Sequence, residues 1–201
     1  MGTHSAPVEN ELHQKTRTDR YASMMLKMYV ETVKPRRDVQ VLDIGPACGD
    51  SIQFFTRFFK RLHVCDMFVR LDRDRRQKRP ADNVWRHLDY APGSFDGIHL
   101  WDLADHLPDA QVSRLAEICF TMLRPKGLLM VIAFDRQQAP SQIHSFVAQD
   151  NFELELQPQT HLELPWYFRH NRGLLDLLAS FSESKSFFYR NGLREFLFQK
   201  K

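Results

Sequence analysis

The segment that most constrains the fold is a short apolar run followed at once by a glycine-containing turn and an amphipathic stretch. Val39–Ile44 is typical of a buried strand, because most of its residues are aliphatic. Gly45–Gly49 forms the turn, and Ser51–Lys60 carries its phenylalanines on one side of a helix. A buried strand that leads through a turn into a helix indicates an α/β protein.

The middle of the chain repeats this alternation. Further apolar runs predict strands at Arg61–Met67, Val84–Tyr90, Phe95–Trp101 and Gly127–Phe134. Helical spacing of apolar residues predicts helices at Thr18–Val33 and Asp109–Leu123. Strands separated by helices imply a doubly wound parallel sheet, and right-handed crossovers place the loops after the strands along one edge.

The last third of the chain has a different pattern. Its segments predict a helix at Ser141–Gln149, a strand at Phe152–Gln157 and a helix at Gly173–Phe181. Asn191-Gly192 then lies between two apolar-rich runs, Ser186–Arg190 and Leu193–Phe198, and this dipeptide favours the type I′ turn of a hairpin. The expected fold is therefore a single doubly wound, mostly parallel seven-stranded sheet flanked by helices, with an antiparallel C-terminal hairpin.

The length of 201 residues suits one compact domain. Residues 1–15 are polar and small and are predicted to be a mobile tail, which leaves residues 16–201 as the domain. Residues from about 158 to 182 are interpreted as a late insertion that covers a substrate site. Within it, Pro165-Trp166-Tyr167-Phe168 has two readings, a lid over an apolar acceptor or core packing.

Composition narrows the class of protein. Three widely spaced cysteines without a CxxC pair indicate neither a disulfide framework nor a zinc site, and they favour a reducing, cytoplasmic compartment. The sequence has no apolar run of about 18 residues and no secretory h-region. A net charge of +3 does not point to a nucleic-acid partner. The basic run Arg70–Arg79 lacks interleaved aromatics, so it is interpreted as a solvated surface.

The turn at Gly45–Gly49 also limits the ligand. A dinucleotide-binding turn has the pattern G-x-G-x-x-G, whereas here the second and third glycine positions hold Ala47 and Asp50. The acidic Asp50 would repel a pyrophosphate, which counts against NAD and FAD. Asp43, just before the turn, instead suits a ligand with a cationic amino group.

This arrangement resembles motif I of the class I S-adenosylmethionine-dependent methyltransferases, with Asp43, Gly45 and Gly49 at its defining positions. The family often has a third glycine where this chain has Ala47. The resemblance implies that S-adenosylmethionine is the cofactor. It also implies that the turn, including Pro46, binds the cofactor.

Further landmarks of that family follow in order between residues 18 and 135. An acidic residue at the position of Asp66 accepts hydrogen bonds from the ribose hydroxyls, and Met67 follows it. Asp89-Tyr90 matches the position beside the adenine. Two further matches are Ser94-Phe95-Asp96 at the entry to the fourth strand and Pro125-Lys126-Gly127 at the turn into the fifth. The simpler readings stay open: Asp43 as a cap of its turn, and Asp66 and Asp89 as ordinary loop carboxylates.

The loop after the fourth strand faces the methyl group in the resembling fold. Trp101 is assigned there to the cofactor site, and Asp102 and His106 are the candidate catalytic bases. His106 has a near-neutral ordinary pKa, although it also suits the role of stabilising the next helix. An Asn-Pro-Pro-Tyr signature is absent, so methylation of amino groups on nucleic-acid bases or glutamine is not supported.

Taken together, the residues predict methyl transfer from S-adenosylmethionine to a small-molecule acceptor. One alternative is a protein of the same fold that binds the cofactor without transferring methyl groups. Another is an NAD-dependent oxidoreductase, which Ala47 and Asp50 disfavour. The sequence identifies neither the acceptor nor the oligomeric state.

Overall fold

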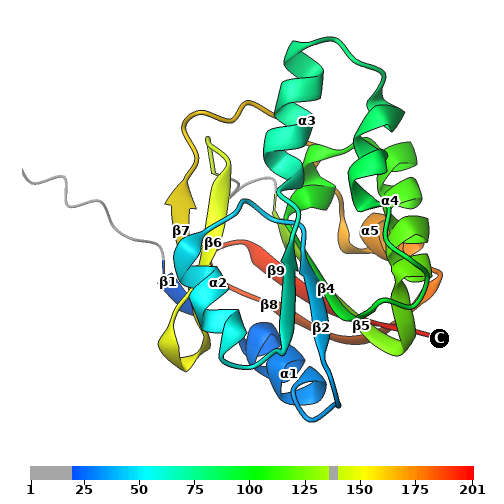
Figure 1. The fold of residues 1–201 in the computed structure, drawn as a ribbon. Coiled ribbons are helices and arrows are strands. Elements are labelled where there is room, and N and C mark those ends of the chain that lie inside the picture. Colours follow the sequence, from blue (N-terminus) through cyan, green and yellow to red (C-terminus); the bar gives the residue numbers. More distant parts are fainter. Residues whose placement is uncertain (1–19, 136–139) are drawn as a thin grey trace, which may run out of the picture.

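The computed structural model describes residues 20–135 and 140–201, and the predicted tail at residues 1–15 lies outside them. The described chain forms a six-stranded sheet and a separate three-stranded sheet (Figure 1). In these described ranges, no helix is both long enough and apolar enough to cross a membrane.

The larger sheet has the strand order β3-β2-β4-β5-β9-β8. Its strands are β2 (Gln40–Asp43), β3 (Arg61–Val64), β4 (Phe95–Trp101), β5 (Leu123–Phe134), β8 (Phe181–Phe188) and β9 (Leu193–Lys200). Strands β3, β2, β4 and β5 run parallel, whereas β9 pairs antiparallel with β5 and with β8. The expected mostly parallel α/β sheet is confirmed, and β8 and β9 form an antiparallel pair on either side of Asn191-Gly192.

The prediction of a strand at Val84–Tyr90 is wrong. These residues belong mainly to η1 (Ala81–Leu88), a 3₁₀ helix. Val84, Trp85 and Leu88 are all buried in the same core cluster, and an alternating strand would place Trp85 on the opposite face from the other two. Helical winding is the conformation that buries all three side chains together.

Helices cover both faces of the larger sheet. They are α1 (Met24–Val33), α2 (Gly49–Thr56), α3 (Met67–Arg76), α4 (Asp109–Met122) and α5 (Asn171–Leu177). Buried side chains of α1 and α2 pack in one core cluster, and those of α3, η1, α4 and α5 pack in the other. Helices α1 and α2 lie on one face of the sheet. The turn before α2 follows β2 directly in the chain, so it lies at the carboxyl end of that strand (Figure 1).

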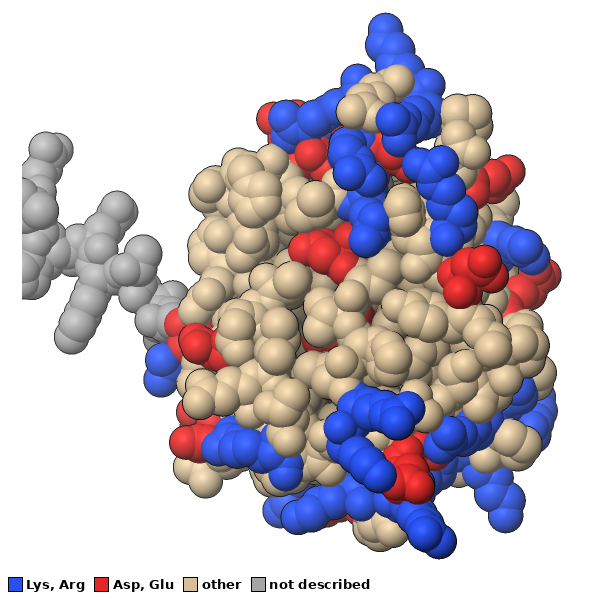
Figure 2. Space-filling view, in the orientation of Figure 1, with Lys and Arg blue, Asp and Glu red and all other residues tan. Residues whose placement is uncertain are grey.

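The basic run interpreted as surface is largely the C-terminal half of α3. Its arginines from Arg73 onward are exposed, and the basic side chains of this end of the molecule gather at the top of Figure 2. Two buried aspartates neutralise part of the charge: Asp72 pairs with Arg76 at 2.7 Å and Asp74 with Arg79 at 3.3 Å.

The three-stranded sheet was not predicted as a unit. It consists of β1 (Arg20–Ala22), β7 (Glu153–Pro158) and β6 (His144–Ala148). The predicted helix at Ser141–Gln149 is therefore wrong. β6 is buried between β7 and α2, so its apolar run lacks the alternation that marks a half-exposed strand. The Ser51 hydroxyl of α2 donates to Phe146 O and accepts from Ala148 N, which ties β6 to the helix after the glycine turn.

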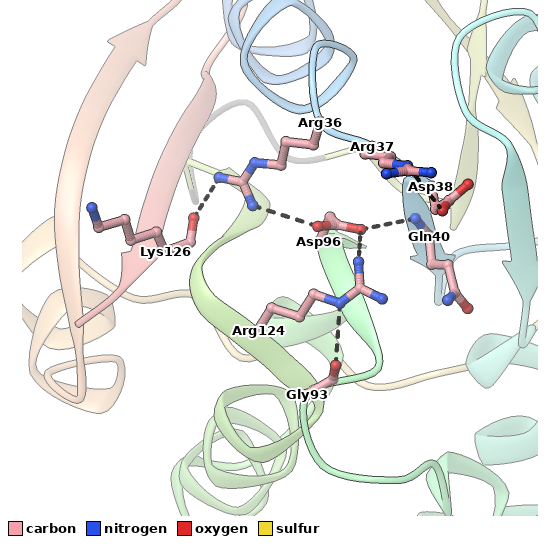
Figure 3. A network of polar contacts seen from close by, with 8 residues as sticks. All are labelled: Arg36, Arg37, Asp38, Gln40, Gly93, Asp96, Arg124 and Lys126. Carbon is pink, nitrogen blue, oxygen red and sulfur yellow. Dashed lines mark hydrogen bonds and ion pairs between the residues drawn. The ribbon is translucent and has the colours of Figure 1, made fainter.

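A polar network holds the amino ends of the central strands (Figure 3). Asp96, buried at the start of β4, accepts from Gln40 N at 2.9 Å and from Arg124 Nη1 at 2.7 Å. Arg36 forms an ion pair with Asp96 at 3.8 Å and donates to Lys126 O. The Asp96 landmark and Lys126, which lies near the start of β5 with a φ of 61°, are therefore together at the edge of the sheet opposite to the carboxyl ends of its parallel strands.

Candidate functional site

Asp43 is the last residue of β2 and its side chain is only 6 % exposed. Its Oδ1 accepts hydrogen bonds from Gly45 N at 2.9 Å and from Trp101 Nε1 at 2.6 Å. Its other oxygen, Oδ2, accepts no hydrogen bond from the described residues, and none of their basic side chains pairs with it. Burial raises the pKa of Asp43 to about 6, although the two hydrogen bonds oppose this shift.

Asp66 follows the neighbouring strand β3 and connects two loops. Its Oδ2 accepts from Ala47 N in the glycine turn, and its Oδ1 accepts from Val69 N, both at 3.0 Å. The second bond caps α3, so the simpler reading of Asp66 as a structural carboxylate holds in part. The side chain is half-buried, and a carboxylate with two accepted bonds retains acceptor capacity.

The two glycines of the turn have different surroundings. A Cβ added to Gly45 would lie 2.1 Å from Cδ1 of Trp101, whereas a Cβ on Gly49 would meet nothing within 4 Å. Trp101 has a φ of 52° and is 2 % exposed, and its indole stacks on Phe146 at 5.5 Å. The indole of Trp101 therefore lies against the turn at Gly45, and the lack of a side chain at Gly45 makes room for it.

The remaining residues assigned to the cofactor are more scattered. Pro46 is half-buried, and Met67 is fully buried in the core on the α3 face. Asp89 and Tyr90 line a separate groove of about 420 Å³ between η1 and α4. The structure thus brings together Asp43, Gly45, Ala47, Asp66 and Trp101, and it does not join Asp89 to them.

The loop after β4 carries a buried acidic cluster. His106 Nε2 lies 3.4 Å from Asp102 Oδ2, and His106 Nδ1 lies 3.1 Å from Pro165 O. Asp105 Oδ2 accepts from Phe134 N, the last residue of β5, at 2.7 Å. Among the described residues, Oδ1 of Asp102 and Oδ1 of Asp105 have no hydrogen-bond partner, although both atoms are buried.

These contacts shift the pKa values in this cluster. Burial raises the pKa of Asp105 to about 7, and the Phe134 N–H opposes the shift. Burial alone would lower the pKa of His106, but the hydrogen bond and negative charge of Asp102 outweigh it, so the pKa is raised. The Asp102–His106 pair is therefore suited to hold a proton. Sequence reasoning missed Asp105, because its burial depends on β5 and not on its own segment.

Residues 165–169 cover this cluster. The ring of Trp166 lies 4.2 Å from that of His106, and Tyr167 N donates to Asp105 O. Arg169 donates to the carbonyls of Ala104 and Leu107, in and just after η2 (Leu103–His106). Trp166 and Phe168 pack against the core cluster of α1 and α2, which agrees with the core-packing reading, and the reading as a lid over an acceptor stays a prediction.

The sequence profile of a family described as "Methyltransferase domain" matches residues 14–185. None of the curated proteins matches the chain.

Among solved structures, the PH0226 protein of Pyrococcus horikoshii OT3 has a TM-score of 0.53 at 15 % identity, over 89 % of this chain and 93 % of its own. A SAM-dependent methyltransferase of Methanosarcina mazei has a TM-score of 0.52 at 16 % identity, over 89 % and 97 %. The N-methyltransferase NodS of Bradyrhizobium japonicum WM9 has a TM-score of 0.52 at 15 % identity, over 88 % and 92 %. At this level of identity, the three structures support the fold alone.

Proposed function

Because the chain belongs to the family of S-adenosylmethionine-dependent methyltransferase domains of class I, we propose that it methylates a small-molecule acceptor beside the carboxyl ends of β4 and β5. Asp43 and the glycine turn hold the methyl donor, Asp66 binds its ribose, and Asp102 with His106 accepts a proton from the acceptor. The observation that carries this proposal is the buried Asp43 carboxylate, which has one uncommitted oxygen and no basic partner among the described residues.

The two carboxylates at the end of β2 and after β3, those of Asp43 and Asp66, fit the cofactor. A buried carboxylate without a positive partner is costly, and the amino group of S-adenosylmethionine supplies that partner. The half-buried Asp66 has acceptor capacity left for the two ribose hydroxyls. Bound in this way, the cofactor supplies an electrophilic methyl group on a sulfonium sulfur.

The residues after β4 perform the remaining chemistry. The Nδ1–H of His106 donates to Pro165 O, so Nε2 is the atom that accepts a proton, and the Asp102 carboxylate beside it favours the resulting imidazolium. Trp166 and its neighbours keep bulk water from this pair, which strengthens the electrostatic effect of Asp102. An acceptor group that carries no proton would need positioning alone.

A thermal-shift panel tests the cofactor part of the proposal. At a ligand concentration of about 100 times Kd, binding stabilises the fold by about 2.7 kcal/mol. For a chain of this length that corresponds to a rise in Tm of about 5–10 °C. We expect this rise with S-adenosylmethionine and S-adenosylhomocysteine and none with NADH. A folded sample that responds to neither adenosyl ligand would overturn the proposal.

The binding should also depend on pH. The ligand's amino group favours ionised Asp43, whose pKa in the free protein is about 6. Protonation below that pKa therefore competes with binding. The affinity for S-adenosylhomocysteine should be constant above about pH 7 and should fall by about tenfold per pH unit below 6. Calorimetric titration between pH 5 and 8 measures this, with Tm recorded at each pH to confirm folding. An affinity that is flat across this range contradicts the role of Asp43.

The proton-accepting pair is tested by its neutral variants. Asp102→Asn and His106→Gln should each lower the methyl-transfer rate by about 10²–10⁴-fold, because general-base catalysis contributes that much. Binding of S-adenosylhomocysteine should be unchanged. Transfer of labelled methyl from S-adenosylmethionine into a metabolite pool provides the assay, with its pH profile as the second readout. Asp176→Asn, an exposed carboxylate on α5, is the control. Wild-type rates in both variants would remove the pair from the mechanism.

A further inference from the structure

We propose that a second cavity, beside the carboxyl end of β5, binds an anionic group of the methyl acceptor, either a carboxylate or a phosphate. This inference rests on the proposed function. The cavity has a volume of about 500 Å³, and its polar lining comprises Asp135, His170, Asn171, Arg172, Tyr189 and Arg194. It lies between the end of β5, the start of α5 and the turn of the β8–β9 hairpin.

Arg194 is the central observation. It lies on β9 and is only 8 % exposed. Its Nη1 donates to Asn171 Oδ1 at 2.7 Å and its Nη2 to Phe134 O at 2.6 Å, which fixes the plane of the guanidinium. Its Nε is buried without a hydrogen-bond partner in the described chain. No carboxylate of the described residues lies within ion-pair distance of this arginine, although its charge reaches Asp105 and opposes the rise in the pKa of that carboxyl.

A buried guanidinium that has no carboxylate within ion-pair distance is costly, since burial removes its hydration. The two fixed contacts are to neutral oxygens, so they orient the group without neutralising it. A guanidinium matches the geometry of a carboxylate or phosphate, and donors remain available after these two bonds. An anion in the cavity would supply a direct ion pair.

The other charged residues around the cavity leave it positive. Arg172 and His170 are exposed, and the side chains of the described residues make no ion pair with either. Asp135 is an acidic lining residue, so two arginines face one carboxylate. The groove between η1 and α4 differs: Arg86 and Arg114 are balanced there by Asp89 and Glu117, and it has no buried, unpaired cation.

One residue connects the cavity to the candidate bases. Phe134 donates its N–H to Asp105 and accepts from Arg194 at its carbonyl. Its ring lies 5.8 Å from that of Trp166, which packs on His106. Phe134 thus joins Arg194 of the cavity to the loop that carries Asp102 and His106.

The test is an NMR titration of the arginine Nε–H signals with inorganic phosphate and, separately, with acetate, at constant ionic strength. In the wild type, the Arg194 signal should shift and saturate in the millimolar range with at least one of the two anions. Arg172→Gln should weaken this binding about tenfold. Arg190→Gln removes an exposed arginine of the same hairpin that does not line the cavity, so it should titrate like the wild type. Arg194→Lys serves only to identify the signal.

The outcomes separate this inference from the proposed function, because S-adenosylhomocysteine binding is measured by thermal shift on the same samples. If that ligand binds while no Nε–H signal shifts, the inference is overturned and the proposed function stands. Equal weakening in Arg172→Gln and Arg190→Gln indicates a general ionic effect and also overturns it. Anion binding without S-adenosylhomocysteine binding excludes the acceptor role of the cavity. The selective loss in Arg172→Gln, with cofactor binding retained, supports it.

Discussion

Asp43→Asn should lower the affinity for S-adenosylmethionine by at least about 100-fold. Removal of one partner of a buried charge pair costs about 3 kcal/mol or more, and each 1.4 kcal/mol is a factor of about ten in affinity. Asparagine retains an oxygen for Gly45 N and Trp101 Nε1, so the turn should keep its shape. The amide nitrogen then takes the place of the oxygen that would face the ligand's amino group. Calorimetric titration with S-adenosylhomocysteine measures the loss.

Two controls distinguish lost recognition from misfolding. Asp50→Asn removes an exposed carboxylate from the same segment and should bind like the wild type. The free Asp43→Asn protein should have an undiminished Tm at pH 8. Burial raises the folded-state pKa of Asp43 to about 6, above its unfolded value, so its ionisation destabilises the folded protein at pH 8 and the neutral amide removes that cost. Wild-type affinity in Asp43→Asn would refute the assignment of this carboxylate.

Gly45→Ala is expected to be the most destabilising small substitution in the site. The new Cβ would lie 2.1 Å from Cδ1 of Trp101, far inside van der Waals contact. Trp101 is held by its bond to Asp43 and by its stacking on Phe146, so it has little room to retreat. Overpacking of this kind costs roughly 3 kcal/mol, which lowers Tm by about 6–12 °C in a domain of this size.

The same turn provides a matched control. Gly49→Ala places its Cβ in open space and should leave Tm almost unchanged, since position 49 is the first residue of α2. The cost of Gly45→Ala should also be smaller in a Trp101→Ala background, because the two residues share one contact. Denaturant unfolding of the wild type, Gly45→Ala, Trp101→Ala and the double variant measures this coupling. Equal effects of alanine at positions 45 and 49 would show that Trp101 does not lie against the turn.

Local sequence patterns predicted the parts of the fold that depend on nearest neighbours. The run from Val39 to Ile44, the glycine turn and the helix after it all have the predicted type, because their apolar spacing matches one element each. Asp43 and Asp66 were identified because they match the family's motif positions at and after two successive strands, and adjacent parallel strands bring such residues to one edge. The acceptor was not predicted, since no local pattern encodes it.

The errors occurred where long-range packing overrode local pattern. The segment Val84–Tyr90 has strand-like composition, but its backbone is mostly helical and directs the apolar side chains into one core cluster. Residues 144–148 were expected to be helical, but they pair with β7 and with the Ser51 hydroxyl, which is distant in sequence. Propensity is a weak guide in both segments, because their burial is decided by partners elsewhere in the chain.

The sequence alone therefore determined the class of fold and the position of the turn that begins the proposed cofactor site. Only the tertiary structure decided how that site is built. It placed Trp101 against Gly45, buried Asp105 through a bond to β5, and oriented Arg194 by hydrogen bonds to two neutral oxygens. Each of these contacts joins strands or loops that are distant in sequence, and burial in such contacts is what shifts a pKa or leaves a charge without a partner.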